Sequence, residues 1–315
     1  MTTLPTDPAE TVAAPALTAA GEEPAHPPSR PPGSTGKRPL RTTAWYATAL
    51  FVCAVMIVPL LWMITIGLKS RNAVFELPPR LLPHEFSWRN FIDGPQAIHF
   101  PRLLLNSTII TALSVLGGVM TAMMAGYALA RLRFPGRKLW FYLFVGSMLL
   151  PGVVGLIPLF QLYKSIGWYD TWLPLIVPAF FGGNPLFIFL ARQYFLAIPY
   201  SIDEAAKIDG AGHLRIFVSV MLPLTRPAWI TMAILAFQAS WNDFLNPLVY
   251  LYSADKWPLS VGMAQFVSPF AGQTPNWSYY MATNLLYMLP PLILFFAAQR
   301  YFIQGLGSLG STTQK

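Results

Sequence analysis

Side chains able to carry out covalent or metal chemistry are scarce in this sequence. The four histidines have no metal-ligand spacing, and the one cysteine, Cys53, lies in an apolar run, which excludes a disulfide framework and a thiolate cluster. No Gly-x-Ser-x-Gly motif marks a hydrolase nucleophile. Residues 31–38 faintly resemble a phosphate-binding loop but lack its first glycine and its final hydroxyl residue. These patterns predict a protein that is not an enzyme and that holds no metal or cofactor.

The most informative polar stretch runs from Ser201 to Pro223, between two strongly apolar segments. Ser201 and Glu204 have the spacing of a capping box, in which the hydroxyl and the carboxylate each satisfy a free amide at a helix start. Gly210 can adopt the left-handed conformation that closes a helix of about two turns. A second short helix is predicted from His213 until Pro223, whose ring disfavours its continuation. The stretch therefore predicts a helix–turn–helix unit between two membrane segments.

This stretch resembles the EAA loop of the permease subunits of ABC importers. The family pattern is Glu-Ala-Ala, three residues, Gly, nine residues and Ile-x-Leu-Pro, and a valine stands here in the isoleucine position. The matching residues are Glu204, Ala205, Ala206, Gly210, Val220, Leu222 and Pro223. In that family the loop is a coupling helix that seats in a groove of a cytoplasmic ATPase subunit. The resemblance implies that these residues couple this chain to an ATPase, with the two alanines leaving one helix side open to it.

The composition predicts an all-α integral membrane protein. Hydrophobic residues make up 54% of the chain and charged residues only 11%, against about 25% charged residues in a typical soluble domain. Apolar stretches close to the roughly 20 residues that a bilayer needs lie within residues 43–307, which the resemblance implies are a permease domain. Its six predicted spans are residues 44–67, 103–130, 139–162, 172–195, 227–251 and 278–302. The resemblance implies a type I ABC importer arrangement, with residues 201–223 as the coupling loop between spans four and five.

Several predicted spans contain small or helix-breaking residues. Pro151 is expected to kink the third span, and residues 182–185, Gly-Gly-Asn-Pro, interrupt the fourth. Broken helices are tolerated in a membrane only where protein or a water-filled cavity satisfies the freed backbone groups. In the second span, Gly117, Gly118 and Gly126 are expected to let helix backbones approach closely, because lipid gives no hydrophobic drive between helices.

The distribution of charge predicts the orientation of the chain. Most of the 21 lysines and arginines lie in segments on the same side as the amino terminus, and the positive-inside rule places that side in the cytoplasm. Both termini and residues 201–223 are therefore predicted to be cytoplasmic. Residues 1–42 are expected to be a disordered tail, because they cannot bury enough apolar surface, and residues 308–315 a short tail. The net charge of +8 reflects this orientation rather than nucleic-acid binding.

Candidate residues for a translocation path are polar side chains within the spans. Asp243 is the only carboxylate in a predicted span, where a charge costs about 2.5–3.5 kcal/mol and usually faces a cavity or a partner. Asn242 and Asn246 lie beside it, and Asn184 follows a glycine pair. The alternative is structural, with Asp243 at an interfacial helix end bonded to the outer cap and the amides joining helices. The segment from Trp241 to Asp243 resembles the fifth span of carbohydrate-type permeases, which implies a sugar substrate.

The resemblance implies a permease subunit of a binding-protein-dependent ABC importer, from the carbohydrate-uptake branch and similar to the maltose-type second permease subunit. Its implied partners are a second six-span permease subunit, two cytoplasmic ATPase subunits, an extracytoplasmic solute-binding protein and the lipid bilayer. Two alternatives are a permease for a non-sugar solute, such as glycerol phosphate, and an ion-coupled secondary transporter. The second alternative would predict paired charges within spans and an internal repeat, whereas the spans hold a single aspartate and no convincing repeat.

Overall fold

The computed structural model describes residues 38–78, 80, 82–83, 85–267 and 274–310. Every regular element in these residues is helical, which confirms the predicted all-α class. Backbone contacts divide the chain into two units, residues 1–55 and 56–315. Most of the predicted amino-terminal tail lies outside the described residues, and its last part, residues 38–42, is helical. Residues 311–315 of the predicted carboxy-terminal tail also lie outside them.

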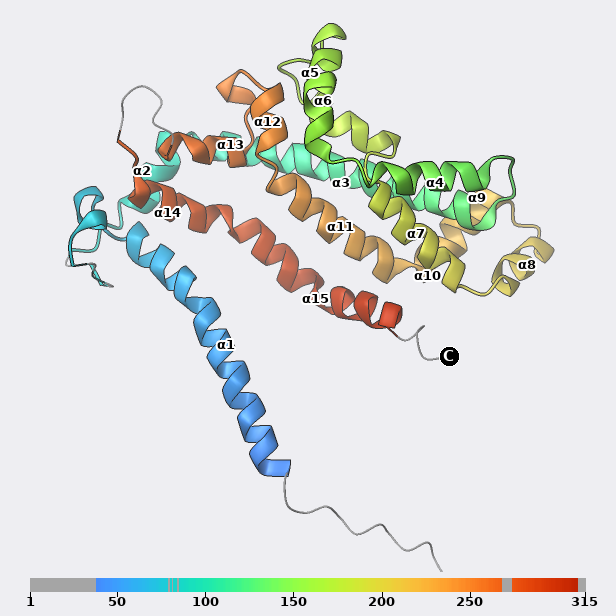
Figure 1. Cartoon of the computed structure of the whole chain (residues 1–315), viewed down its shortest axis with the longest axis horizontal. Coiled ribbons are helices and arrows are strands. Elements are labelled where there is room, and N and C mark those ends of the chain that lie inside the picture. Colours follow the sequence, from blue (N-terminus) through green and yellow to red (C-terminus); the bar gives the residue numbers. More distant parts are fainter. Residues whose placement is uncertain (1–37, 79, 81, 84, 268–273, 311–315) are drawn as a thin grey trace, which may run out of the picture. The chain divides into compact units, whose positions relative to one another are not determined.

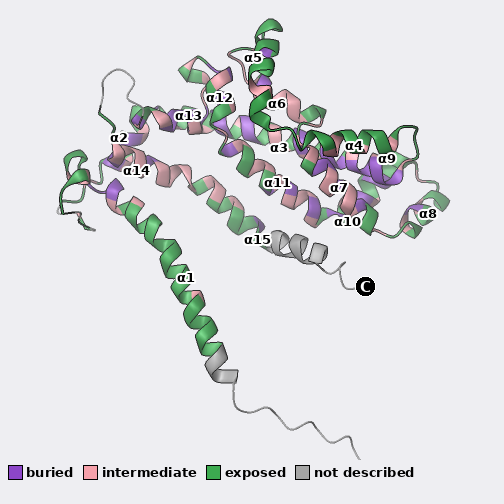
Figure 2. Cartoon of the chain, viewed as in Figure 1, coloured by how far each residue is buried: buried purple, intermediate pink, exposed green. Residues whose placement is uncertain are grey.

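Helix α1 (Arg38–Gly67) contains the first predicted span. The segment from Thr42 to Gly67 is long and apolar enough to cross a membrane, and most of its residues are exposed (Figure 2). An apolar helix with such a surface suits a lipid or protein environment rather than water. Only its last turns belong to the second unit, where Met63 accepts a hydrogen bond from Asn284 and Gly67 approaches the backbone of Ala282.

Helix α3 (Phe100–Arg131) is the most buried of the long helices and packs against α7 (Pro185–Ala197) and α11 (Arg226–Trp241) (Figures 1 and 2). A methyl group placed on Gly126 would lie 2.6 Å from the Cβ of Ala191, so the two helices touch through their backbones there. The predicted close approach at small residues is therefore confirmed at Gly126. The main apolar cluster lies around this contact and includes Met123, Tyr127, Phe195, Ile216 and Met232.

The third and fourth predicted spans are broken. The third consists of α4 (Arg137–Ser147) and a second segment, Gly152–Ser165, that contains α5 (Leu156–Ser165) and is bent by 96° from the first. Pro151 precedes the second segment and has an extended backbone, as the predicted kink requires. The fourth begins with α6 (Leu173–Ile176), followed by a 3-10 turn, and restarts as α7 after Gly182, which has a φ of +81°.

The last part of the permease domain contains the fifth and sixth predicted spans. Helix α11 ends at Trp241, and after a break α12 (Leu245–Tyr250) completes the fifth. Helices α14 (Trp277–Tyr287) and α15 (Leu289–Gly310) form the sixth and meet at Met288, next to the predicted kink at the proline pair. Among the described residues, four helical segments are long and apolar enough to cross a membrane, or up to six if each of two bent pairs is one span.

Short elements complete the fold at the ends of the long helices. Helix α2 (Asn90–Ala97) packs on α14, and the amide of Asn90 donates to the carbonyls of Gly67 and Lys69, both at 2.8 Å. The other short elements are the 3-10 turns Arg71–Phe75, Ala254–Lys256 and Ala264–Phe266 and helix α13 (Leu259–Met263). This end of the domain therefore carries a folded cap over α3 and α14.

Candidate functional site

Helix α8 (Ser201–Ile208) forms the first half of the predicted helix–turn–helix unit. It ends in a Schellman motif, in which the amide of Ala211 donates to Ala206 at 2.9 Å and that of Gly210 donates to Lys207 at 3.0 Å. Gly210 has a φ of +78°, the left-handed conformation expected for a closing glycine. A methyl group at Gly210 would have no heavy atom within 4 Å, so its backbone conformation alone favours glycine.

The predicted capping box is wrong. Ser201 lies inside the first turn of α8, and the residue before the helix, Tyr200, has a helical backbone and receives no side-chain cap. The turn begins upstream, where the amide of Ile202 donates to Pro199 and that of Glu204 donates to Tyr200. A serine hydroxyl one position too far into the helix cannot reach the free amides. The carboxylate of Glu204 is therefore left exposed on the helix surface.

The start of α8 is fixed to the end of α3. The hydroxyl of Tyr200 donates to the carbonyl of Ala130 at 3.1 Å, and the guanidinium of Arg131 lies 4.4 Å from the Tyr200 ring centroid. Arg131 also donates to the carbonyls of Phe195 and Ile198, each at 2.6 Å. These contacts join the last turn of α3, the end of α7 and the first turn of α8 into one corner.

A buried ion pair lies at this corner. Arg131 and Asp203 approach to 3.2 Å, with only 2% and 4% of their side chains exposed. The sequence analysis assigned no role to Asp203. The available signal was an aspartate beside the motif and an arginine ending an apolar helix, but their pairing depends on the tertiary fold.

The surface of α8 differs on its two sides. Glu204, Ala205 and Ile208 are exposed, whereas Ala206 is half-buried against the apolar cluster of α3 and α7. The expectation that both alanines face a partner is therefore corrected, since Ala206 packs inside the chain. The open side consists of a carboxylate, a small residue and an apolar side chain, which a partner backbone can approach closely.

The second half of the unit is one irregular helix that ends at Leu224, one residue beyond the predicted stop at Pro223. It comprises α9 (His213–Ile216), a π-helical turn (Phe217–Met221) and α10 (Leu222–Leu224). The π turn widens the backbone ahead of the proline and accommodates its missing amide. The helix then breaks at Thr225, whose hydroxyl donates to the carbonyl of Met221 at 2.8 Å. Helix α11 follows, and its axis is bent by 79° from that of His213–Leu224.

The remaining motif residues lie in this irregular helix. Val220 and Leu222 are half-buried, and Leu222 packs against the main apolar cluster, whereas Pro223 is exposed. The motif therefore divides into residues on the surface of α8 and residues that join α10 to the bundle.

The polar residues of the fifth span lie at the break between α11 and α12. The carboxylate of Asp243 accepts from the backbone and side-chain amides of Asn246, at 3.2 and 2.9 Å, and its carbonyl accepts from Ser260 at 2.7 Å. A cavity of about 20 Å³ beside it is lined by the hydroxyl residues Ser107, Thr111 and Ser240. Asp243 and Asn246 are therefore brought together at this break.

The other two path candidates lie elsewhere. Asn242 is exposed, donates to the carbonyl of Gln238 at 2.9 Å and accepts from the hydroxyl of Tyr287 at 3.0 Å. Asn184 precedes α7 with an extended backbone and is not among the residues that line the cavity at Asp243. The structure thus does not join the four predicted residues into one polar surface.

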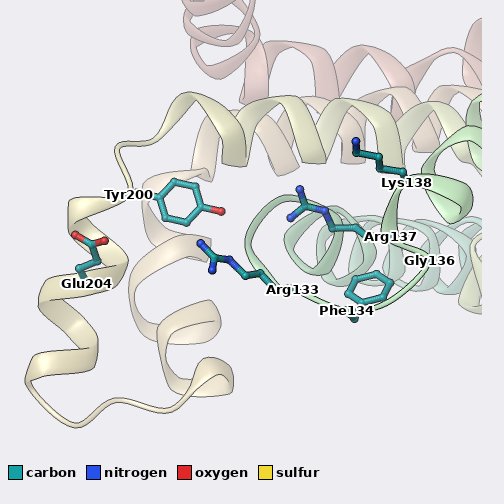
Figure 3. Close-up of a pocket in the computed structure, with 7 residues that line it drawn as sticks. All are labelled: Arg133, Phe134, Gly136, Arg137, Lys138, Tyr200 and Glu204. Atoms are coloured by element: carbon teal, nitrogen blue, oxygen red, sulfur yellow. The ribbon is translucent and has the colours of Figure 1, made fainter.

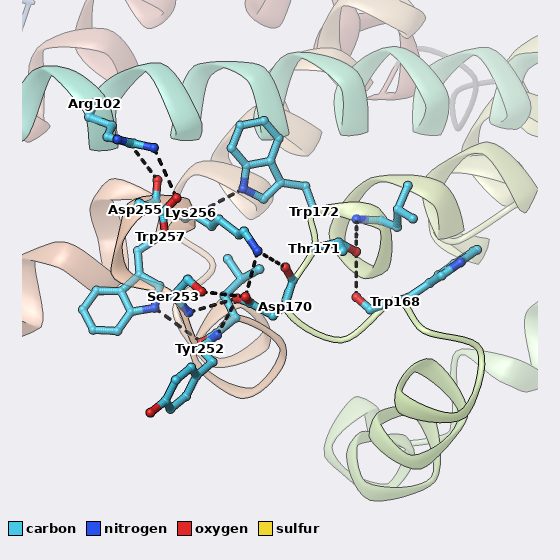
Figure 4. A network of polar contacts seen from close by, with 12 residues as sticks. Arg102, Trp168, Asp170, Thr171, Trp172, Tyr252, Ser253, Asp255, Lys256 and Trp257 are labelled. Atoms are coloured by element: carbon cyan, nitrogen blue, oxygen red, sulfur yellow. Dashed lines mark hydrogen bonds and ion pairs between the residues drawn. The ribbon is translucent and has the colours of Figure 1, made fainter.

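A polar network that the sequence analysis missed ties the loop after α5 to the loop after α12 (Figure 4). The carboxylate of Asp170 accepts from the amides of Tyr252 and Ser253, from the Ser253 hydroxyl at 2.6 Å and from Lys256 at 2.7 Å. Desolvation of the carboxylate disfavours its ionisation, but these hydrogen bonds outweigh it and hold the pKa of Asp170 well below its usual range. Trp172 adds a bond to the carbonyl of Lys256 at 2.9 Å.

This network is continuous with α3. Arg102 forms an ion pair with Asp255 at 3.2 Å, and Asn106 donates to the carbonyls of Asp255 and Trp257, both at 2.9 Å. The amide of Leu259 donates to the hydroxyl of Ser107 at 2.7 Å. Helix α3 therefore carries fixed contacts at both ends, with the Asp170 network at its start and the Arg131 corner at its finish.

The described residues form an all-helical bundle with four to six candidate membrane spans, the class of an integral membrane protein. Residues 114–308 match the family described as "Binding-protein-dependent transport system inner membrane component". The chain belongs to this family, so it is a permease subunit of ABC importers and not itself an enzyme. The predicted resemblance is confirmed.

Individual relatives agree with this assignment. The chain is 30% identical over 255 residues to the diacetylchitobiose uptake system permease protein NgcG of Streptomyces coelicolor, covering 81% of this chain and 84% of that one. It is 30% identical over 243 residues to the sn-glycerol-3-phosphate transport system permease protein UgpE of Pectobacterium atrosepticum, covering 75% and 85%. A chain in the crystal structure of a bacterial ABC transporter involved in alginate import matches with a TM-score of 0.74 and 23% identity, covering 87% of this chain and 100% of that one. This structural likeness shows the shared fold.

Proposed function

We propose that this chain is the permease subunit of an ATP-driven importer that moves a sugar or oligosaccharide across the cytoplasmic membrane. Support comes from the family match and from a relative named for the uptake of diacetylchitobiose. A relative named for glycerol phosphate raises the alternative of a phosphorylated solute. The charged residue at the break of the fifth span is acidic Asp243, and no lysine or arginine lines the cavity beside it. That polarity suits a neutral polyol better than a phosphate.

The coupling element in this proposal is α8, with Glu204, Ala205, Ala206 and Gly210, together with Val220, Leu222 and Pro223 in the following helix. The observation that carries it is the buried Arg131–Asp203 pair beneath an exposed motif surface. A helix joined to α3 by a buried charge pair cannot shift without moving α3 or breaking that pair, which is costly. Movement imposed on α8 by an ATPase is thus passed to the central helix of the bundle.

The assembly and orientation complete the proposal. The proposed chain has six spans, with both termini and residues 201–223 in the cytoplasm, and the positive-inside distribution of lysine and arginine supports this orientation. A second six-span permease subunit would complete the pathway, two ATPase subunits would supply the energy, and an extracytoplasmic solute-binding protein would deliver the solute. In this arrangement Asn184, Asn242, Asp243 and Asn246 are path residues contributed by the break points of spans four and five.

The coupling assignment is tested by co-purification of the ATPase with the membrane-inserted full chain. Glu204→Ala should insert and purify like the wild type but retain markedly less ATPase, because the Glu204 side chain is exposed and its removal leaves the backbone bond of its amide to Tyr200 in place. Glu85→Ala removes an exposed glutamate from the segment between α1 and α2 and serves as the matched control. Equal ATPase recovery with Glu204→Ala and wild type would contradict coupling through this face.

The substrate class is tested on the importer's solute-binding protein. Thermal unfolding is measured with a panel of mono- and oligosaccharides and with glycerol phosphate. A rise in unfolding temperature with a saccharide alone supports the proposal. A rise with glycerol phosphate alone would contradict it and select the phosphorylated solute.

A further inference from the structure

A basic hollow of about 830 Å³ lies between the α3–α4 turn and the start of α8 (Figure 3). Its walls carry three cations, Arg133, Arg137 and Lys138, and one carboxylate, Glu204. Gly136 adopts a φ of +79°, which turns the chain so that these side chains flank a common space. The coupling proposal uses Glu204 but assigns nothing to the three cations opposite it.

The positive charge of this hollow is not neutralised within the described residues. Asp203, the nearby acid on α8, is already paired with Arg131. Arg192 adds a fourth cation within electrostatic reach of Arg137, and its guanidinium lies against the ring of Phe141 at 4.1 Å. Its buried Nε has no hydrogen-bond partner in the described part of the chain. Cations gathered this closely repel one another, so an anion in the hollow would be bound favourably.

An apolar surface begins directly beside these cations. Leu139, Trp140 and Leu143 on the first turns of α4 are more than half exposed, and Tyr142 lies among them. A basic cluster that leads into exposed apolar and aromatic side chains is the pattern of a membrane interface. An anionic headgroup would meet the cations while its acyl chains followed α4. An acidic protein surface would leave this face of α4 uncovered.

We propose that the hollow formed by Arg133, Arg137 and Lys138 binds the phosphate of an anionic phospholipid, with the lipid chains lying on the exposed face of α4. The site is separate from the proposed solute path. The lipid proposal does not depend on whether α8 contacts an ATPase. Bound lipid would place a fixed negative charge next to Glu204 at the base of the coupling helix.

The test uses the purified full chain in detergent and brominated lipids, which quench nearby tryptophans. The contribution of Trp140 is the difference in tryptophan fluorescence between wild type and Trp140→Phe. Brominated phosphatidylglycerol should quench this signal at a much lower mole fraction than brominated phosphatidylcholine. Arg133→Gln/Lys138→Gln should weaken this preference roughly 30-fold, from two cations near a lipid surface.

Two further variants separate the site from general charge and from misfolding. Lys207→Gln/Arg215→Gln removes two exposed cations from α8 and α9 and should keep the preference. Arg133→Lys/Lys138→Arg keeps the charge and should also keep it, whereas a loss in this pair would contradict a charge-based site. Equal quenching of Trp140 by the two lipids, as expected if an acidic ATPase surface is the occupant, would overturn the proposal. An equal loss in the Lys207→Gln/Arg215→Gln control would also overturn it.

Discussion

The guanidinium of Arg131 and the carboxylate of Asp203 lie 3.2 Å apart, and both side chains are almost fully buried. Arg131 ends the central helix α3, and Asp203 lies in the first turn of α8, immediately before the motif glutamate. This single contact joins the surface that carries the EAA pattern to the helix that packs on α7 and α11. It also identifies the side chains whose loss should uncouple α8 from the bundle.

Loss of one partner of this pair should be more harmful than loss of both. Arg131→Met leaves the Asp203 carboxylate buried without a counter-charge, which costs about 3–5 kcal/mol, whereas replacing both partners by apolar residues is often neutral. We therefore expect a lower thermal unfolding temperature for Arg131→Met than for Arg131→Met/Asp203→Leu, measured by tryptophan fluorescence in detergent. Additive losses in the double variant would show that the two charges do not interact.

Gly210 should be replaceable only by residues that tolerate a left-handed backbone. A Cβ at this position would have no heavy atom within 4 Å, so the main cost of Gly210→Val is the positive φ, about 1–2 kcal/mol. Gly210→Asn should be milder, because asparagine visits this conformation more readily. Unfolding temperature and ATPase recovery should both fall in the order glycine, asparagine, valine. Indistinguishable values for valine and glycine would show that the closing turn has no strict conformational requirement.

Two glycines of α3 should respond differently to the same substitution. A methyl group at Gly126 would lie 2.8 Å from the backbone nitrogen of Arg192, whereas one at Gly118 would have no heavy atom within 4 Å. Gly126→Ala should therefore destabilise the protein by about 1–3 kcal/mol, as overpacking does, and Gly118→Ala should not. Unfolding temperatures of the two variants in the same detergent check this. Similar values would place the contact of α3 and α7 elsewhere.

Asp170 should make the stability of the contacts between the loops after α5 and α12 dependent on pH. Its hydrogen bonds lower its pKa in the folded protein, so its stabilising contribution is full above the unfolded pKa of about 3.9. It is lost as pH falls through the folded pKa. Asp170→Asn should lower the unfolding temperature at pH 7, and the gap from wild type should shrink at acid pH. A gap that stays constant from neutral pH to pH 3 would contradict a stabilising role of the charge.

The sequence predicted the features that depend on local residue types. The left-handed Gly210, the interruption at residues 182–185 and the close approach at Gly126 follow from glycine chemistry, and the structure has all three. The helical class follows from composition. The family followed from the spacing of Glu204, Gly210 and the later Leu-Pro pair.

Features that depend on contacts between distant segments could not be predicted. The capping box failed because Tyr200, held by Ala130, starts the helix one residue early. The π turn that precedes Pro223 was not predicted, although the helix ends at Leu224, one residue beyond that proline. The partners of Asp203 and Asp170 lie on other elements, and no periodicity in the sequence indicates which cations they meet.

The sidedness of Lys207 tests the central claim most directly, because α8 must face the compartment that holds the ATPase. Lys207→Cys is made in a Cys53→Ser background, so that it carries the only thiol of the chain, and Glu85→Cys serves as the external control. A membrane-impermeant maleimide added to intact cells should label Glu85→Cys and leave Lys207→Cys unlabelled. Inside-out vesicles stripped of ATPase should then expose Lys207→Cys. Labelling of Lys207→Cys from outside intact cells would place the coupling helix on the wrong side of the membrane and contradict the account.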